Sequence, residues 1–400
     1  MMRFSVLLPT RNRLDLVKYA VETVRRQDYD DWEIIISDNY SEDDIAGYVH
    51  SLKESRIKYY RTESFIPVTD NWNNALEKST GDYVIMLGDD DCLMRGYFST
   101  VSKLVEEYED PDFIYTRALL YAYPGVMPGY PEGFLHLAGC ATFFQNSENP
   151  FWLDGKQAFR LVQRSMSFRL SFDFNMQYAT ISRKFIKSLA YAGKFFQSPY
   201  PDFYAMTVMM LKGSRILIFS KPMVIIGISG KSFGFFYFNQ REQQGIEFLK
   251  NFPDENATRL LGGVLLPGTN MNTSWLLAME TIRLNFLSEF NLRVAYQRYR
   301  LLQMIHVYGR YYAQKNLPKA EMLELKRHMK IWEKLLYGSI LWLIYSLRRL
   351  TSRCSNKILS RFIKIAIGQY PAHDVVESRK RCNNIIEVFE SIDPLKPFID

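Results

Sequence analysis

The sequence has few cysteine and histidine residues, and their spacing forms no recognised framework. Its four cysteines lie far apart, with no CxxC pair, and the five histidines show no HxxxH or similar spacing. Isolated cysteines are typical of free thiols in a reducing compartment, and the histidine spacing argues against a zinc site. We therefore expect neither zinc nor disulfide bonds among Cys92, Cys140, Cys354 and Cys382.

The sequence also lacks a long hydrophobic run. The N-terminal residues MMRFSVLLPTRNR become charged too early for a secretory signal and are typical of a first β-strand. The longest apolar stretch, LLYGSILWLIYSL at 335–347, is shorter than the roughly 20 residues needed to span a bilayer. We expect a cytoplasmic protein without a membrane-spanning helix.

What the sequence does contain is enough apolar material for a large core. It has 400 residues, of which 47% are hydrophobic, and a net charge of +7. This length favours two or three domains, and this composition excludes wholesale disorder. Basic residues gather near the C-terminus without a recognised nucleic-acid-binding module, so no nucleic-acid partner is expected.

The first part of the chain alternates between strand and helix patterns. Compact apolar runs predict strands at 4–9, 32–38, 57–61 and 82–88, and apolar residues at helical spacing predict helices at 14–27, 41–55 and 68–81. We expect the helix at 41–55 to open at Ser41 and the helix at 68–81 to be capped by Asp70. This alternation predicts an α/β fold with a mostly parallel, Rossmann-like sheet and helices on both faces.

Three polar clusters follow the predicted strands: PTRNR after the first, SDNYSEDD after the second and GDDD after the fourth. Parallel sheets bind ligands outside the carboxyl ends of their strands, so we expect these clusters to form one cleft. The adjacent carboxylates of Asp89, Asp90 and Asp91 repel one another unless a cation is present. Two interpretations stay open: a solvated turn, or a site for Mg²⁺ or Mn²⁺ beside phosphates.

Four segments together resemble the inverting family 2 glycosyltransferases of the GT-A fold: SVLLPTRNR, EIIISDNYSEDD, NWNNALEKSTGDYVIMLGDDD and SPYPDFYAM. The resemblance covers about residues 3 to 230. It implies a GT-A domain at 1–239, with a nucleotide-sugar half at 1–115 and an acceptor half at 116–239. It also implies a nucleotide diphosphate sugar donor, a hydroxyl acceptor and a Mn²⁺ or Mg²⁺ cofactor.

The resemblance further implies roles for individual residues. Pro9, Thr10 and Arg11 would line the nucleotide pocket, and Asp38 would accept a hydrogen bond from the base imide, which favours UDP-sugars and then dTDP-sugars. The remaining nucleotide-binding residues would be Asn39, Asn71, Asn74 and Asp89. The family pattern Asp-x-Asp-Asp makes Asp90 the main metal ligand, with Gly88 in place of the first acid and Asp91 in support; a shifted register makes Asp89 and Asp91 the ligands.

The family also places a general base at the start of a later helix, which corresponds here to Asp202. The alternative is that Asp202 only caps that helix, and Asp173 and Asp154 are the next candidates for the base. Lys231, in the Gly-flanked segment ISGKSFG, is either a phosphate contact or a solvated lysine. The aromatic segment FGFFYF at 233–238 is expected to lie mostly in the core.

Residues 240–400 change to long helical patterns that the family resemblance does not cover. The apolar stretch 335–347 precedes a basic amphipathic stretch at 348–368, which suits a helix on an anionic membrane surface. The alternative is a helical bundle or the contact face of a homo-oligomer with a basic rim. Attachment to the inner face of the cytoplasmic membrane would suit an enzyme with a lipid-linked acceptor.

The predicted function is therefore sugar transfer to a saccharide or lipid-linked acceptor in cell-surface polysaccharide assembly. One alternative is a non-catalytic protein that binds nucleotide sugars or supports assembly, although the intact Asp38 and aspartate triplet argue against it. Another is a sugar nucleotidyltransferase, which usually has a Gly-rich phosphate loop after the first strand. The segment LLPTRNRLD lacks those glycines.

Overall fold

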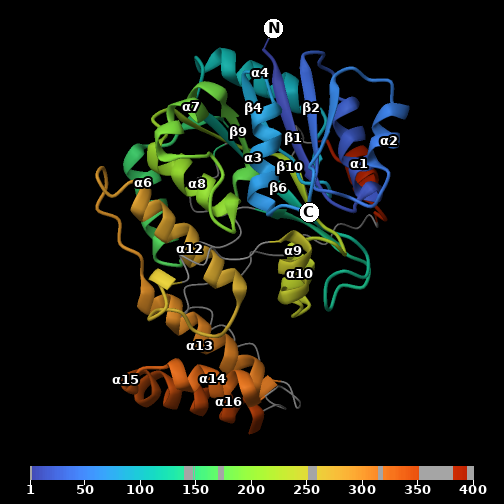
Figure 1. Cartoon of the computed structure of the whole chain (residues 1–400). Helices are drawn as coiled ribbons and strands as arrows, with labels where there is room; N and C mark the ends of the chain where they lie inside the picture. The colour runs from blue at the N-terminus through green and yellow to red at the C-terminus, as the bar shows by residue number, and fades with distance from the viewer. Residues whose placement is uncertain are drawn as a thin grey trace. The chain divides into compact units, whose positions relative to one another are not determined.

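The chain forms two compact units in the computed structural model (Figure 1), which describes residues 2–138, 147, 149–169, 175–250, 259–313, 319–350 and 382–393. Unit 1 comprises Met1–Val162, Phe172–Phe252 and Asp374–Asp400, and unit 2 comprises Gln163–Ser171 and Pro253–His373. The sequence-based division places 240–400 together, whereas in the structure 240–252 and the C-terminal segment group with unit 1.

The first half of the unit 1 sheet is parallel, as predicted. Its strands are β1 (Phe4–Thr10), β2 (Trp32–Asp38), β3 (Ile57–Arg61) and β4 (Tyr83–Met86), in the spatial order β3-β2-β1-β4. β2 is buried along its whole length, which explains its nearly continuous apolar sequence. The connecting helices are α1 (Leu14–Arg25), α2 (Ile45–Ser51) and α3 (Val68–Lys78).

These helices begin at other residues than the sequence predicts. Helix α2 begins after Asp44, whose side chain accepts a hydrogen bond from the backbone N–H of Gly47, and not at Ser41. Helix α3 follows Pro67, so Asp70 lies in its first turn and is not the N-cap. Both expected caps are therefore wrong, because several residues able to cap stand close together and the path of the chain selects among them.

The second half of the sheet mixes strand directions. The strands are β5 (Cys92–Leu93), β6 (Phe113–Ala122), β7 (Phe134–Ala138), β8 (Phe151–Trp152), β9 (Ala179–Ser182) and β10 (Ile216–Ile228). β9 lies between β4 and β6 and is antiparallel to both, whereas β6 and β10 are parallel. The predicted α/β fold is thus confirmed, with a sheet that is parallel in its first half and mixed in its second.

The sheet is accompanied by helices and short turns from the later part of unit 1. They are α4 (Tyr97–Glu107), α7 (Arg183–Ser188), α8 (Pro201–Lys212), α9 (Phe233–Phe238), α10 (Glu242–Leu249), η1 (Met176–Tyr178) and η2 (Ala190–Ala192), and α6 (Gly155–Met166) crosses the boundary to unit 2. None of the residues of α9 is buried, so the expectation that FGFFYF lies mostly in the core is wrong. Residues 233–237 are partly buried, and Phe238 is exposed.

A helix from the C-terminal end of the chain completes unit 1. Helix α18 (Ile385–Ser391) contacts α1 and β5. Its buried side chains, including Ile385, Val388 and Phe389, join Cys92 and Ile225 of β5 and β10 in one hydrophobic cluster. The Tyr121 hydroxyl donates to the carbonyl of Cys382, 2.8 Å away. The sheet core behind β5 therefore depends on residues from both ends of the sequence.

Unit 2 is helical, as predicted. It contains α12 (Asn270–Asn285), α13 (Tyr296–Ala313), α14 (Lys319–His328), α15 (Ile331–Glu333), the π-helical turn η3 (Lys334–Gly338) and α16 (Ser339–Leu350). Helix α13 contacts α12, α14 and α16, and its Arg300 forms a buried ion pair with Glu333 at 2.6 Å. Within the described ranges no helix has the length and hydropathy to cross a membrane. Most of the basic stretch 348–368 lies outside the described residues.

Candidate active site

The polar clusters that follow β1, β2 and β4 meet at the carboxyl edge of the unit 1 sheet. Thr10 and Asp38 are paired at the ends of β1 and β2. Beyond β4, Asp89 accepts a hydrogen bond from the Thr10 hydroxyl at 2.8 Å. The convergence follows from the parallel register, because neighbouring parallel strands present their carboxyl ends at one edge.

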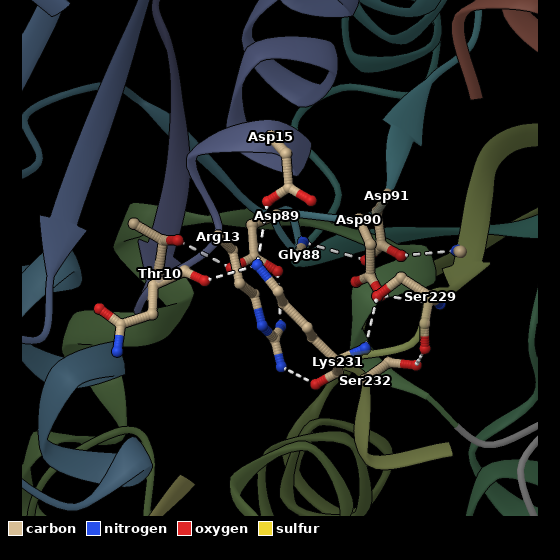
Figure 2. Close-up of polar contacts among 12 residues, drawn as sticks. Thr10, Arg13, Asp15, Gly88, Asp89, Asp90, Asp91, Ser229, Lys231 and Ser232 are labelled. Carbon is tan, nitrogen blue, oxygen red and sulfur yellow. Dashed lines mark hydrogen bonds and ion pairs between the residues drawn. The ribbon is translucent and has the colours of Figure 1, made fainter. Parts of the chain in front are cut away.

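Asp89 is held by two partners on the β1–α1 connection (Figure 2). One carboxylate oxygen accepts from Thr10, and the other forms a 2.6 Å ion pair with Arg13. The Arg13 guanidinium also donates to the carbonyl oxygen of Lys231. Burial lowers the pKa of Arg13, but the charges of Asp89 and Asp90 outweigh it and raise the pKa. Asp89 and Arg13 thus form a buried pair that joins the segments following β1, β4 and β10 at this edge of the sheet.

Asp91 is fully engaged in hydrogen bonds. Its carboxylate accepts from the backbone N–H of Gly227 at 2.9 Å and of Gly88 at 3.0 Å, and from the Gln177 side chain at 2.8 Å. A Cβ atom at Gly88 would lie only 2.5 Å from an Asp91 oxygen, so no larger residue fits at that position without a shift. Asp91 therefore ties β4 to β10.

Asp90 differs from its neighbours because only one of its carboxylate oxygens is paired. Oδ2 accepts from the Ser229 hydroxyl at 2.7 Å and from the Ser229 N–H at 3.3 Å, and Oδ1 has no partner within the described part of the chain. Burial raises the pKa of Asp90 to about 6, with Arg13 lowering it and Asp89 raising it. Burial and the charge of Asp90 raise the pKa of Asp91 well above its ordinary value.

The donor set fits a divalent cation that is shared with a substrate. The described residues contain no group of three or more His, Cys, Asp or Glu side chains that could hold a metal. Mg²⁺ and Mn²⁺, however, are often bound by one or two carboxylates together with substrate phosphates. Asp90 offers one unpaired oxygen, and burial, with a smaller contribution from the charge of Asp89, raises its pKa, so that a bound cation would favour its ionised form.

On the nucleotide side, Asp38 is nearly without exposed surface, at 1%. Its carboxylate accepts from the Tyr59 hydroxyl at 2.6 Å and from the Ser41 N–H at 3.0 Å. Burial, followed by the hydrogen bond to Asp38, raises the pKa of Tyr59. A carboxylate has about four lone-pair sites, so these two bonds leave capacity for a further donor such as a base imide.

The three asparagines of the predicted nucleotide site bind the protein itself. The side chain of Asn39 bonds to both the N–H and the C=O of Ile66, at 2.9 and 2.8 Å. Asn71 exchanges hydrogen bonds with Ser37 at 2.7 and 3.0 Å, and Asn74 donates to the Ser37 hydroxyl at 2.8 Å. These contacts fix the carboxyl end of β2 against α3 and the 62–67 segment.

Basic side chains gather over the same edge. Arg11, next to the half-buried Pro9, lies 3.8 Å from the centre of the Phe65 ring and donates to the Phe248 carbonyl at 3.3 Å. Lys231 donates to the Asn12 carbonyl at 2.8 Å and pairs with Asp15 at 3.1 Å. Lys231 is therefore bound to the β1–α1 connection and is not simply a solvated lysine. The segment from 231 to 250 thus contacts the predicted nucleotide pocket.

Asp202 lies in the first turn of α8, where Tyr200 is the N-cap and Pro201 the first helical residue. Asp202 is thus not the N-cap residue itself, but its carboxylate interacts with N–H groups of the first turn, and the capping alternative stays open. Burial raises the pKa of Asp202 to about 6, although the N–H groups of Phe203 and of Asp202 itself lower it. A carboxylate that titrates near neutral pH is suited to general-base chemistry. Asp202 makes no hydrogen bond or ion pair with the triplet in the described structure.

The structure gives no support for the other two candidates for the general base, Asp154 and Asp173. Asp154 is exposed and accepts a hydrogen bond from the Lys156 N–H at 3.0 Å at the start of α6, as a helix-capping residue does. Asp173 lies outside the described residues.

Two buried tyrosine hydroxyls near the acids, those of Tyr123 and Tyr200, have no hydrogen-bond partner among the described residues. Burial is the main cause that raises the pKa of both phenols, and the nearest acidic charges, of Asp90 and of Asp202 respectively, add to it. An unsatisfied buried hydroxyl costs about 1–3 kcal/mol, so such groups often await a ligand.

Sequence reasoning missed Arg13, Ser229, Gln177 and Tyr123. Only Arg13 carried a signal, because it belongs to the PTRNR cluster. Asn12 adopts a left-handed conformation with φ of 52°, which turns the chain so that Arg13 points back to Asp89. Ser229 and Gln177 are far from the triplet in sequence and reach it only through the pairing of β10 and the position of η1.

The fold is an α/β domain with acidic residues beyond the carboxyl ends of its parallel strands, and one part of it matches a known family. Residues 5–164 match the family described as Glycosyl transferase family 2. Residues 5–164 thus form a family 2 glycosyltransferase domain, and the predicted family is confirmed for that part of the chain.

Two curated relatives illustrate the similarity. One is the GalNAc(5)-diNAcBac-PP-undecaprenol β-1,3-glucosyltransferase of Campylobacter jejuni, 37% identical over 110 residues, or 27% of this chain and 36% of the relative. Another is the putative colanic acid biosynthesis glycosyl transferase WcaA of Escherichia coli, 29% identical over 135 residues, or 32% and 48%. The chain thus spans less than half the length of these relatives.

Among solved structures, a similar chain is residues 1–349 of TarS of S. aureus, with a TM-score of 0.45 and 16% sequence identity. The match covers 78% of this chain and 87% of that chain.

Proposed function

We propose that this chain is a metal-dependent inverting glycosyltransferase of cell-surface polysaccharide assembly. It moves a sugar from a nucleotide diphosphate sugar, with UDP favoured and dTDP next, to a hydroxyl of a saccharide or lipid-linked acceptor. The names of the two relatives, one for an undecaprenol-linked glycan and one for colanic acid, support this class of acceptor. Activity at the inner face of the cytoplasmic membrane would suit a lipid-linked acceptor.

One observation carries the proposal. Within the family 2 domain, Asp90 is a buried carboxylate with an unpaired oxygen beside two fully bonded acids, Asp89 and Asp91. The protein supplies hydrogen-bond partners for both oxygens of Asp89 and Asp91 but for only one oxygen of Asp90. This is expected of a residue whose remaining partner binds together with the substrate. Asp90 is the proposed metal ligand, which favours the common family register over the shifted one.

The donor would bind at the same edge of the sheet. Asp38 would accept the imide N–H of the base, between Pro9 and Thr10 on one side and the segment fixed by Asn39, Asn71 and Asn74 on the other. Arg11 and Lys231 are the proposed phosphate contacts, since both already lie over the β1–α1 connection. A bound Mg²⁺ or Mn²⁺ would neutralise the negative charge of the departing diphosphate.

Asp202 is the proposed general base. It takes the proton of the acceptor hydroxyl while that oxygen forms its bond to the anomeric carbon. The bond from the anomeric carbon to the diphosphate oxygen breaks, and its electron pair leaves with the nucleoside diphosphate. A single displacement of this kind inverts the anomeric configuration. The buried hydroxyl of Tyr200, which has no hydrogen-bond partner among the described residues and lies near the charge of Asp202, is suited to orient the acceptor.

A thermal-shift panel of UDP-, GDP-, dTDP- and CMP-sugars, each with Mn²⁺ or with chelator, tests the proposal. We expect the largest rise in melting temperature with a UDP-sugar and Mn²⁺, because binding to the folded state alone stabilises it. Equal shifts in chelator would contradict the metal dependence. Binding without turnover on any saccharide or lipid-linked acceptor would instead favour the non-catalytic alternative.

A further inference from the structure

The described end of unit 2 has an apolar outer face. Along α15, η3 and α16, seven large apolar side chains are exposed, from 40% for Trp332 to 78% for Ile331. The opposite face of the same helical segment packs inward through Gly338, Leu341 and Tyr345. The exposed set, here called the outer stripe, consists of Ile331, Trp332, Leu335, Leu336, Ile340, Trp342 and Leu343.

Such a stripe is unusual on a soluble domain. A surface helix normally has charged residues on the face opposite the core, whereas a helix that is apolar all round is covered by something. Exposed apolar residues scattered singly need no explanation, but a contiguous patch marks an interaction surface. The outer stripe combines two tryptophans with branched aliphatic side chains, the mixture favoured at a membrane–water interface.

The lysines and the acids that lie near the outer stripe in sequence differ in their pairing. Lys326, Lys330 and Lys334 are exposed and have no ion-pair partner among the described residues. The acids of the same stretch are all engaged: Glu333 with Arg300, Glu321 with Arg310, and Glu324 with Arg327 and His328. The stretch 326–334, which leads into and overlaps the outer stripe in sequence, therefore presents uncompensated positive charge.

The positive charge favours one of two possible partners for the outer stripe, an anionic bilayer rather than a second copy of the chain. In a symmetric dimer the same patch would face itself, so the uncompensated lysines of both copies would be brought together. A bilayer with anionic headgroups offers the opposite charge to the lysines and an apolar layer to the stripe. No described helix of the chain can cross a membrane, so the contact would be parallel to the surface.

We infer that the outer stripe and its lysines are a docking surface for an anionic lipid bilayer. The apolar side chains enter the headgroup region and the lysines contact the phosphates of the lipids. This deepens the membrane contact of the proposed function by assigning its residues and its lipid class. It does not depend on the identity of the sugar donor.

Vesicle flotation of the full chain tests the inference. Vesicles of phosphatidylglycerol and phosphatidylcholine should bind the protein, and vesicles of phosphatidylcholine alone should bind it much less. The double variant Leu335→Gln and Trp342→Gln should lose about tenfold or more in partitioning, because two exposed apolar anchors are removed. The variant Lys330→Glu with Lys334→Glu should lose about tenfold on anionic vesicles only.

Matched controls are available in the same chain. Leu287→Gln removes an apolar side chain of similar exposure, 60%, outside the outer stripe. Lys103→Glu with Lys187→Glu makes the same change in net charge on exposed residues of unit 1. Both controls should float like the wild type, and all variants should keep the wild-type affinity for UDP with Mn²⁺.

Equal flotation of wild type and stripe variant would overturn the inference. So would a dimer in analytical ultracentrifugation that the stripe variant abolishes without any vesicle binding, since the stripe would then be a self-association face. Because UDP affinity is measured on the same samples, a failure of lipid docking is distinguishable from a failure of the proposed glycosyltransferase function.

Discussion

The pKa values of buried carboxylates are shifted in opposite directions at the two ends of the parallel strands in unit 1. At the amino end of β2, Glu33 accepts hydrogen bonds from Ser5 at 2.7 Å and from Lys58 at 2.7 Å, and it also bonds Thr80. Burial alone would raise the pKa of Glu33, but these donors lower it to about 2. At the carboxyl end, burial raises the pKa of Asp90 to about 6.

The contrast in pKa shows that Glu33 stabilises the folded state when it is ionised, whereas ionised Asp90 destabilises it. Glu33 is fully satisfied and joins β1, β3 and the turn before β4. Asp90 is buried next to two other acids and keeps an unpaired oxygen. Acids that are costly to bury and incompletely paired are typical of functional sites. We therefore expect changes at the amino end to affect stability and changes at the carboxyl end to affect activity.

The largest expected effect is at Asp202, the other acid whose pKa is raised to about 6. Asp202→Asn should reduce turnover by about 10²–10⁴-fold, the usual contribution of a general base. Nucleotide and metal affinity should change little. In the wild type, kcat/KM should rise with pH and level off above about 6, because only the ionised carboxylate accepts a proton.

Steady-state kinetics of the variant and a pH profile of the wild type measure this effect. Asp154→Asn, which changes an exposed acid at the start of α6, is the matched control and should keep turnover. Near-full turnover of Asp202→Asn would place the base elsewhere. A product with the donor's anomeric configuration would contradict the single displacement.

Asp90→Asn should give the next largest effect, a loss on the order of 100-fold in UDP affinity with Mn²⁺, as expected when a metal ligand is removed. Calorimetric titration with Mn²⁺ and with chelator isolates the metal-dependent part. Asp89→Asn should cost less of that affinity but should lower the melting temperature, because Arg13 loses its buried partner. The opposite order of the two variants would support the shifted register, in which Asp89 and Asp91 bind the metal.

Glu33→Gln should lower the free energy of unfolding by about 2 kcal/mol, because hydrogen bonds to a charged group are lost. The stabilisation by Glu33 is present above its ordinary pKa of 4.5 and is lost as the pH falls towards 2, so the variant should approach the wild type in acid. Urea unfolding at several pH values measures this. An equal loss of UDP affinity in Glu33→Gln would break the comparison between the two strand ends.

The smallest expected effect has the opposite sign. In chelator at neutral pH, Asp90→Asn should raise the free energy of unfolding by about 1 kcal/mol, because a carboxyl that ionises more readily in the unfolded chain opposes folding. The contribution of Asp90 to stability is present below its ordinary pKa of 3.8 and is lost as the pH rises through about 6. The gain should therefore vanish near pH 4. A lower melting temperature for Asp90→Asn would mean that Asp90 is structural.

The alternation of strands and helices from Phe4 to Met86 was predictable because its signal is local. Apolar runs and helical spacing are read from neighbouring residues, and the parallel rule then brings Thr10, Asp38 and Asp89 to one edge. The insertion of β9 between β4 and β6 was not predictable, because its four residues, Ala179–Ser182, pair with strands that lie far away in the sequence on both sides, Tyr83–Ile85 and Phe113–Tyr115. The same holds for the two-residue strand β5 on β10.

The site was predictable as a location but not as a set of contacts. The triplet, Asp38 and the PTRNR cluster are visible in the sequence, whereas the difference between Asp89, Asp90 and Asp91 is not. That difference arises from Ser229, Gln177 and Arg13, whose side chains are placed by β10, η1 and the turn at Asn12. Spacing within a motif carries no information about such distant partners.

The packing of α18 has a consequence for synthesis. Ile385, Val388 and Phe389 complete the hydrophobic cluster under β5, the strand that directly follows the aspartate triplet. A ribosome makes these residues only after it has made all of unit 2. Because domains usually fold as their segments emerge, the hydrophobic cluster under β5 stays incomplete until residues 385–389 have been made. A chain terminated within unit 2 would therefore lack the side chains that pack under β5.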